Sequence, residues 1–169
     1  MHGVLIPLSE YLTTSYRPDR EYLDGAVVER NLGEREHSAL QVELAIILSR
    51  MRRQLGFHIF TEQRVQVTEQ RFRVPDVCVL VGPKPTQPIF TTPPFLCIEI
   101  LSKDDRMSEM QERIDDYLKF GVGYVWVVDP LRRRAHIHTS EGSREVKDGI
   151  LGTSNPEITV ALDELFAVL

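Results

Sequence analysis

The stretch Val74-Pro75-Asp76-Val77-Cys78-Val79-Leu80 places a carboxylate at the head of an apolar strand. A second apolar run, Phe95-Leu96-Cys97-Ile98-Glu99-Ile100-Leu101, carries a single acid of its own. An unpaired carboxylate inside a hydrophobic strand is costly unless a cation compensates it. A hard divalent cation with oxygen ligands is the simplest such partner for two acids on adjacent strands. The pair Asp76 and Glu99 therefore predicts an enzyme with a metal site.

Alternation along each strand decides how the two acids can meet. Asp76 shares a strand face with Cys78, and Glu99 shares one with Cys97. If the two strands pair, both carboxylates lie near the same edge of the sheet. Such a pair suits Mg²⁺ or Mn²⁺, because Mg²⁺ keeps several waters and accepts a phosphate oxygen. A metal of this kind lowers the pKa of bound water and neutralises charge on a phosphoryl group.

Length and composition set broad limits on the protein. The chain has 169 residues, of which 42% are hydrophobic and 27% charged, so we expect one compact domain over residues 1–169. Two cysteines exclude a disulfide framework or a cysteine-rich zinc site. The N-terminus is too quickly polar for a signal peptide, and no apolar run is long enough for a membrane span. We therefore expect a cytoplasmic protein without a membrane partner.

The net charge of −5 argues against tight nonspecific binding of nucleic acid, which depends on Lys and Arg. Charge is local, however, and arginines cluster within 50–53 and 132–134. These clusters keep a nucleic-acid partner possible.

Regular elements are expected on both sides of the acidic pair. Asp24-Gly25 is a strong turn signal and predicts a hairpin over 21–29. Apolar residues at helical spacing predict helices over 37–55 and 106–120. We expect strands at about 57–67, 74–81, 95–101 and 122–129. This order predicts an α/β domain with a central mixed β-sheet flanked by α-helices.

With these elements in place, nearly the whole chain resembles the Uma family of predicted restriction endonucleases, within the PD-(D/E)xK nuclease superfamily. The matching segments are Glu21–Gly25, His37, Pro75-Asp76, Glu99–Ser102, Tyr117 and Tyr124–Pro130. The resemblance implies a restriction endonuclease-like fold and Mg²⁺- or Mn²⁺-dependent cleavage of DNA, with Asp76 and Glu99 as metal ligands. Cutting both strands of a duplex needs two sites, so a homodimer is expected.

The resemblance also locates the family's lysine, which this chain lacks. Two residues after Glu99, where a standard motif has lysine, stands Leu101. In the Uma family the lysine is instead expected on the following helix, four residues before the tyrosine, and that position is Arg113. Lys103 is a second departure, since the family usually has proline there.

Helical spacing suggests that the side chain of Arg113 can reach a site beneath its helix. The apolar stripe of this helix consists of Met107, Met110, Ile114, Tyr117 and Leu118. Arg113 flanks this stripe beside Tyr117. An arginine does not give up its proton at neutral pH, so it is no general base. It could bind the scissile phosphate in a bidentate manner or stabilise developing negative charge, and water activation would fall to the metal.

Four further residues are possible members of the site. His37 is either a catalytic base or a helix-start residue that bonds its neighbours. Glu62, on the strand before the Pro-Asp pair, either completes the metal site or faces solvent. Lys103 lies in the strand-to-helix connection, and Gln111 flanks the other edge of the apolar stripe.

Three functions remain open from the sequence. The first is a metal-dependent endonuclease that uses Asp76, Glu99 and Arg113. The second is a catalytically inactive module of the same fold that binds DNA or protein. The missing lysine and the acidic net charge favour this module, and Glu99 would then simply pair with Arg113. The third is a hydrolase that acts on a small phosphodiester.

Overall fold

A six-stranded mixed sheet forms the centre of the computed structural model, which describes residues 5–31 and 34–169. Neighbouring strands are antiparallel except for one parallel pair, β7 with β8. In spatial order the strands are β10 (Gly142–Glu145), β9 (Arg134–Thr139), β8 (Tyr124–Asp129), β7 (Leu96–Ile100), β6 (Val77–Val81) and β3 (Phe57–Thr61). The helix α3 (Met107–Phe120) provides the crossover that a parallel pair requires.

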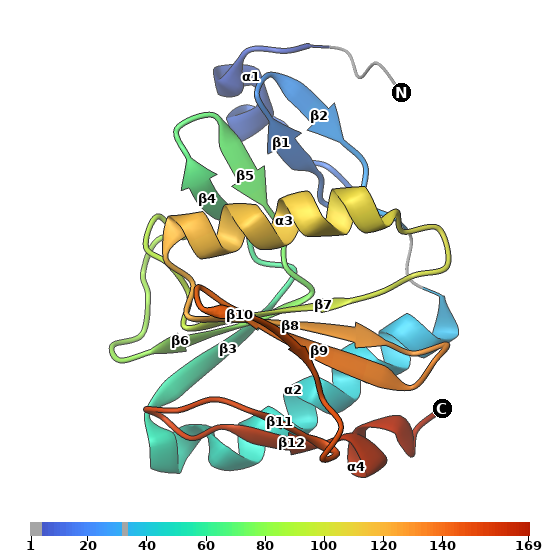
Figure 1. The fold of residues 1–169 in the computed structure, drawn as a ribbon. Coiled ribbons are helices and arrows are strands. Elements are labelled where there is room, and N and C mark those ends of the chain that lie inside the picture. Colours follow the sequence, from blue (N-terminus) through green and yellow to red (C-terminus); the bar gives the residue numbers. More distant parts are fainter. Residues whose placement is uncertain (1–4, 32–33) are drawn as a thin grey trace.

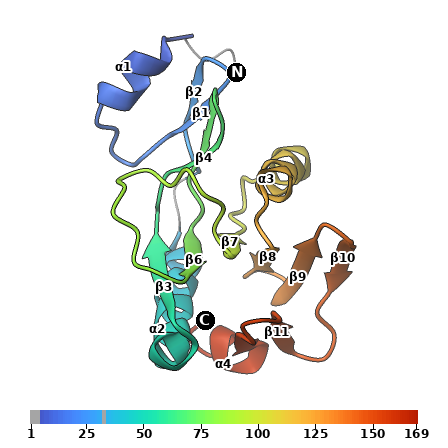
Figure 2. The same cartoon turned by 90° about the vertical axis from the view of Figure 1, so that its left-hand side faces the viewer.

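Helices cover both faces of this sheet, as predicted. Figure 1 shows α3 above the sheet and α2 (Arg35–Leu55) below it. The hairpin of β11 (Ile150–Gly152) and β12 (Thr159–Ala161) lies on the α2 side, together with α4 (Leu162–Phe166). The view in Figure 2 looks along the two long helices and separates the same layers.

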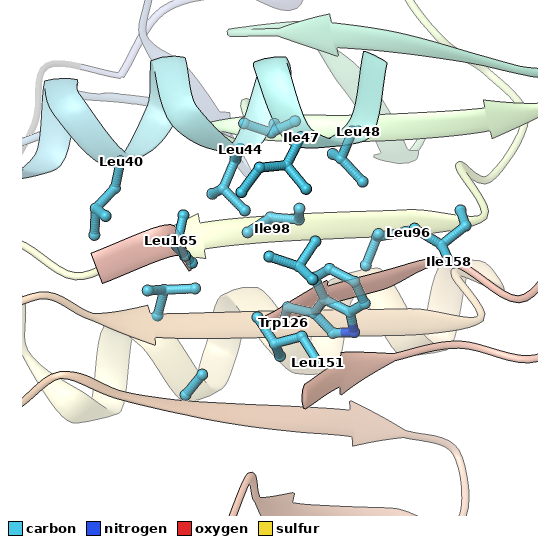
Figure 3. Packing of buried hydrophobic residues seen from close by; sticks show 14 of the residues in the cluster. Leu40, Leu44, Ile47, Leu48, Leu96, Ile98, Trp126, Leu151, Ile158 and Leu165 are labelled. Carbon is cyan, nitrogen blue, oxygen red and sulfur yellow. The ribbon is translucent and has the colours of Figure 1, made fainter. Parts of the chain in front are cut away.

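Strand alternation divides the buried side chains between these two layers. Ile98 and Trp126 belong to the core cluster on the α2 side, whereas Cys97 and Val125 belong to the cluster beneath α3. Figure 3 shows four apolar residues of α2 lying over β7 and β8: Leu40, Leu44, Ile47 and Leu48. Burying each large side chain of this kind stabilises the fold by about 1.5–3 kcal/mol. This packing fixes which face of β7 turns toward α3.

A smaller four-stranded sheet lies beyond α3 in Figure 1. Its strands, in spatial order, are β2 (Ala26–Val28), β1 (Glu21–Leu23), β5 (Arg71–Arg73) and β4 (Val65–Thr68). The predicted turn joins β1 to β2, with positive φ angles of 50° at Asp24 and 99° at Gly25. Aromatic side chains of this sheet, Tyr22 and Phe72, pack against Tyr11 of α1 (Leu8–Thr13).

Three sequence expectations are corrected by the structure. The strand expected over 57–67 is two strands in different sheets, because the chain turns at Glu62, whose φ is 54°. The strand expected from residue 74 begins at Val77, so Pro75 and Asp76 precede it. Met107, expected in the buried stripe of α3, is 76% exposed. Among the described residues, no helix is both long and apolar enough to cross a bilayer.

Candidate functional site

The pairing of β6 with β7 brings the two predicted acids together. Val77 pairs with Ile98 and Cys78 with Cys97, and one further step of this antiparallel register sets Asp76 opposite Glu99. Both residues are buried, at 2% and 1% exposure. Asp76 stands just before β6, and Glu99 lies next to the end of β7, so both occupy the same edge of the sheet.

Asp76 is surrounded by hydrogen-bond donors. Its Oδ2 accepts the backbone N–H of Ile100 at 2.7 Å and lies 3.2 Å from Nε2 of His37. Its Oδ1 pairs with a guanidinium nitrogen of Arg30, whose other terminal nitrogen donates to Oε2 of Glu62 at 2.6 Å. Burial alone would raise the pKa of Asp76, but His37, Arg30 and the Ile100 N–H together lower it below its usual value. The carboxylate is thereby kept ionised.

Glu99 points toward α3 and meets two of its side chains. The hydroxyl of Tyr117 donates to Oε1 of Glu99 at 2.7 Å, and Nη1 of Arg113 donates to Oε2 at 3.2 Å. Burial, and after it the negative charge of Asp76, outweigh the opposing effect of Arg113 and raise the pKa of Glu99 to about 7. The carboxyl of Glu99 therefore holds a proton more readily than an exposed glutamate does.

Arg113 is held from its other side by a buried ionic network. Its Nε lies 3.3 Å from Oε1 of Glu21 in β1. Oε2 of Glu21 accepts a hydrogen bond from Arg73 at 2.8 Å, and Arg73 in turn donates to Asp116 at 2.7 Å. These contacts join the small sheet to α3. They fix the guanidinium of Arg113 between two carboxylates, as the helical spacing suggested.

A pocket of about 20 Å³ opens where these groups meet, with space for about one water-sized group. Its lining consists of Arg30, Asn31, His37, Asp76, Glu99, Ile100, Ser102, Asp105 and Arg113. The backbone N–H of Ser102 donates to Asp105 at 2.7 Å, and the side-chain amide of Asn31 donates to the other oxygen of Asp105. Oγ of Ser102 is buried and has no hydrogen-bond partner among the described residues.

Two of the predicted additional residues lie outside this pocket. Lys103 pairs with Glu34, and its side chain is 57% exposed. Gln111 donates to Asp115 at 2.9 Å on the exposed side of α3. Neither side chain is brought to the acids, because both lie on surfaces that face solvent.

The other two predicted residues are beside the acids. His37 contacts Asp76 directly, so it does more than begin a helix. Glu62 is exposed, yet it contacts Arg30 and accepts a hydrogen bond from Gln41 at 3.1 Å. It therefore lies at the rim of the site. Its carboxylate is linked to the Asp76 carboxylate through Arg30, and its backbone N–H donates to the Asp76 carbonyl at 3.3 Å.

Sequence reasoning missed several polar members of this region, among them Ser102, Glu21 and Arg30. Ser102 could have been found, since it closely follows the strand that carries Glu99. Glu21 was known only as part of a hairpin motif. Arg30 gave no signal, because it stands 46 positions before Asp76 in the sequence.

The residues present fit a divalent cation of the Mg²⁺ type. Two hard carboxylates line the same pocket, the pKa of Glu99 is raised, and the buried hydroxyl of Ser102 lacks a partner within the described structure. No group of three or more His, Cys, Asp or Glu side chains in residues 5–31 and 34–169 could enclose a metal by itself. An ion here would depend on waters and on substrate oxygens, which matches the coordination habit of Mg²⁺.

Comparison with known proteins supports a nuclease relationship. A solved structure described as "a putative nuclease belonging to DUF820", from Anabaena variabilis ATCC 29413, is similar to this chain with a TM-score of 0.83 and 25% sequence identity. The similarity covers 96% of this chain and 98% of that one. No curated protein matches the chain. The model of the Uma2 family, described as "Putative restriction endonuclease", matches residues 9–165. The chain therefore belongs to the Uma2 family.

Proposed function

We propose that this protein is a divalent-metal-dependent endonuclease that hydrolyses phosphodiester bonds in DNA. The observation that carries the proposal is the register of β6 and β7, which sets Asp76 opposite Glu99 beside a fixed arginine. The two carboxylates would hold Mg²⁺ or Mn²⁺. When bound, such an ion supplies a water of lowered pKa and neutralises charge on the phosphoryl group.

Arg113 is assigned to the phosphate rather than to proton transfer. The neighbouring carboxylates of Glu99 and Glu21 raise its pKa against the effect of burial, so the guanidinium stays charged. Arg113 lines the pocket, and a guanidinium there can donate to a phosphate oxygen. A guanidinium fixed in advance stabilises charge that develops in the transition state without having to reorganise.

DNA as the substrate is supported by a basic turn at the same edge of the sheet. The parallel strands β7 and β8 end at this edge, and the turn from β8 to β9 carries three exposed arginines, Arg132, Arg133 and Arg134. Such side chains can neutralise backbone phosphates next to the pocket although the net charge of the chain is −5. Cutting both strands would require two copies of the site, so a two-fold homodimer is part of the proposal.

Nicking of supercoiled plasmid at low salt, with Mg²⁺ or Mn²⁺, tests the proposal. We expect the wild type to nick and Asp76→Ala to be inactive. If only Arg113→Lys nicks, the metal site is intact but the natural arginine does not support turnover. Silence from all three proteins, with no rise in melting temperature on adding metal, would contradict the proposal.

A catalytically inactive binding module is the second candidate. It is favoured by the direct ion pairs of Arg30 with Asp76 and of Arg113 with Glu99, since both acids already have a cationic partner. The module predicts that duplex DNA or a protein partner binds equally well to the wild type and to Asp76→Ala, with or without divalent metal. The endonuclease predicts that metal changes DNA binding in the wild type only.

A further inference from the structure

The proposed chemistry leaves one buried cation of the site without a role. Arg30 lies in the connection after β2, and its side chain is only 12% exposed. One terminal nitrogen pairs with Oδ1 of Asp76, and the other donates to Oε2 of Glu62 at 2.6 Å. Arg30 also lines the pocket that contains Glu99 and Arg113. The positive charge of Arg30 thus lies directly beside Asp76, a carboxylate proposed to bind the metal.

The hydrogen bonds of Asp76 show which of its oxygens an incoming ion would meet. Oδ2 is committed to the backbone N–H of Ile100 and to Nε2 of His37, and both donors belong to regular elements of the fold. Among residues 5–31 and 34–169, Oδ1 is committed only to Arg30. A divalent cation at Oδ1 would be repelled by this guanidinium at contact distance, so metal binding favours its displacement.

We propose that Arg30 is a built-in competitor for the divalent cation, holding Asp76 in the metal-free protein and withdrawing when the metal binds. The inference rests on the proposed function. Glu62 gives the withdrawn guanidinium a partner at the rim, because its contact with Arg30 does not involve Asp76 and its side chain is 42% exposed. Arg30 in this way keeps a buried carboxylate paired without a metal and lowers the apparent affinity for the metal. If Asp76 is free of Arg30 in only about a tenth of the molecules, the apparent affinity for the metal is about tenfold weaker than that of a fully free Asp76.

The test is direct measurement of Mn²⁺ binding by electron paramagnetic resonance of the free ion, which needs no cleavage activity. Wild type is compared with Arg30→Met, which removes the charge but keeps an apolar stem. Arg35→Met is the matched control, since Arg35 is a neighbouring arginine that is exposed and pairs with Glu36. Melting temperatures establish that each variant folds. If Arg30→Met does not fold, Arg30→Gln replaces it, because glutamine keeps a hydrogen-bond donor for Asp76.

We expect Arg30→Met to bind Mn²⁺ at least about tenfold more tightly than the wild type. Arg35→Met should stay within about twofold of the wild type, because solvent screens an exposed charge. Adding Asp76→Asn to Arg30→Met should remove the gain. Equal or weaker binding by a folded Arg30 variant, while the wild type binds Mn²⁺, would overturn this inference and leave the proposed function intact. If neither protein binds Mn²⁺, the inference and the proposed metal site fail together.

Discussion

Arg113 on α3 donates a hydrogen bond from Nη1 to Oε2 of Glu99 at 3.2 Å. The same guanidinium contacts Glu21 of the small sheet, so it spans the two parts of the fold that meet at the pocket. An arginine can occupy the position where a lysine is expected because its long side chain contacts Glu99 and Glu21 at once. Substitutions of Arg113 can therefore distinguish a catalytic role from a purely structural one.

Substitution of Arg113 should change the nicking rate according to the charge that remains. Arg113→Met removes a fixed cation beside the phosphate, and we expect the initial nicking rate to fall about 100-fold. Arg113→Lys should nick at least as fast as the wild type, since an ammonium group preserves the charge. Lys119→Met, on the exposed side of the same helix, is the control and should not alter the rate. A wild-type rate in folded Arg113→Met would refute the assigned role.

Ser102→Ala should separate ligand binding from folding. Oγ of Ser102 is buried without a partner in the described part of the chain, so its removal deletes no hydrogen bond to these residues. We expect an unchanged or slightly higher melting temperature. If the hydroxyl contacts substrate, losing that bond should weaken cleavage by about tenfold. A lower melting temperature with unchanged cleavage would give the hydroxyl a structural role instead.

Glu21 should contribute to stability in a way that depends on pH. Burial would raise its pKa, but Arg113 and Arg73 lower it below the usual 4.5. Its ionised form therefore stabilises the fold fully above pH 4.5, and this contribution is lost as the pH falls through the lowered pKa. At pH 7, Glu21→Gln should reduce the free energy of unfolding by about 3 kcal/mol, because it leaves buried arginines without their partner.

Urea unfolding over a range of pH checks this expectation. The difference between wild type and Glu21→Gln should shrink as the pH drops below 4.5. Glu29→Gln is the matched control, since Glu29 pairs with Arg20 at the surface and is 74% exposed. Its effect should stay within about 0.5 kcal/mol. A difference for Glu21→Gln that is independent of pH would show that packing, and not charge, is lost.

Lys103→Ala and Gln111→Ala should leave cleavage unchanged. Their side chains bond Glu34 and Asp115 on exposed surfaces and do not line the pocket. Loss of such surface contacts changes stability by no more than about 0.5 kcal/mol. Kinetic comparison of both variants with the wild type on the same plasmid tests this. A large loss of rate in either one would mean that the site extends beyond the pocket described.

The sequence was most informative where the structure follows the regular spacing of residues along a strand or a helix. Strand alternation was enough to place Asp76 and Glu99 at one sheet edge, because both lie next to apolar runs that pair directly. Helical spacing was enough to bring Arg113 beside Tyr117 and toward Glu99. Family resemblance added the order of the motifs, and membership of the family is confirmed by the match over residues 9–165.

The sequence was least informative where the chain passes between the two sheets. The turn at Glu62 falls in the polar stretch 61–64, which carries neither glycine nor proline, so one strand was expected in place of two. Arg30 reaches Asp76 from such a connection, and no local pattern encodes that contact. The partners of buried charges depend on this tertiary path, which is why the arginine on Asp76 was not foreseen.

Anomalous diffraction from a Mn²⁺-soaked crystal would show whether Asp76 and Glu99 hold a divalent cation. We expect one strong anomalous peak in the pocket, with an oxygen of each carboxylate at a coordination distance of about 2.1 Å. The peak should be absent from crystals of Asp76→Ala. A wild-type crystal without a peak between the two acids, at a Mn²⁺ concentration that supports plasmid nicking, would rule out this metal site.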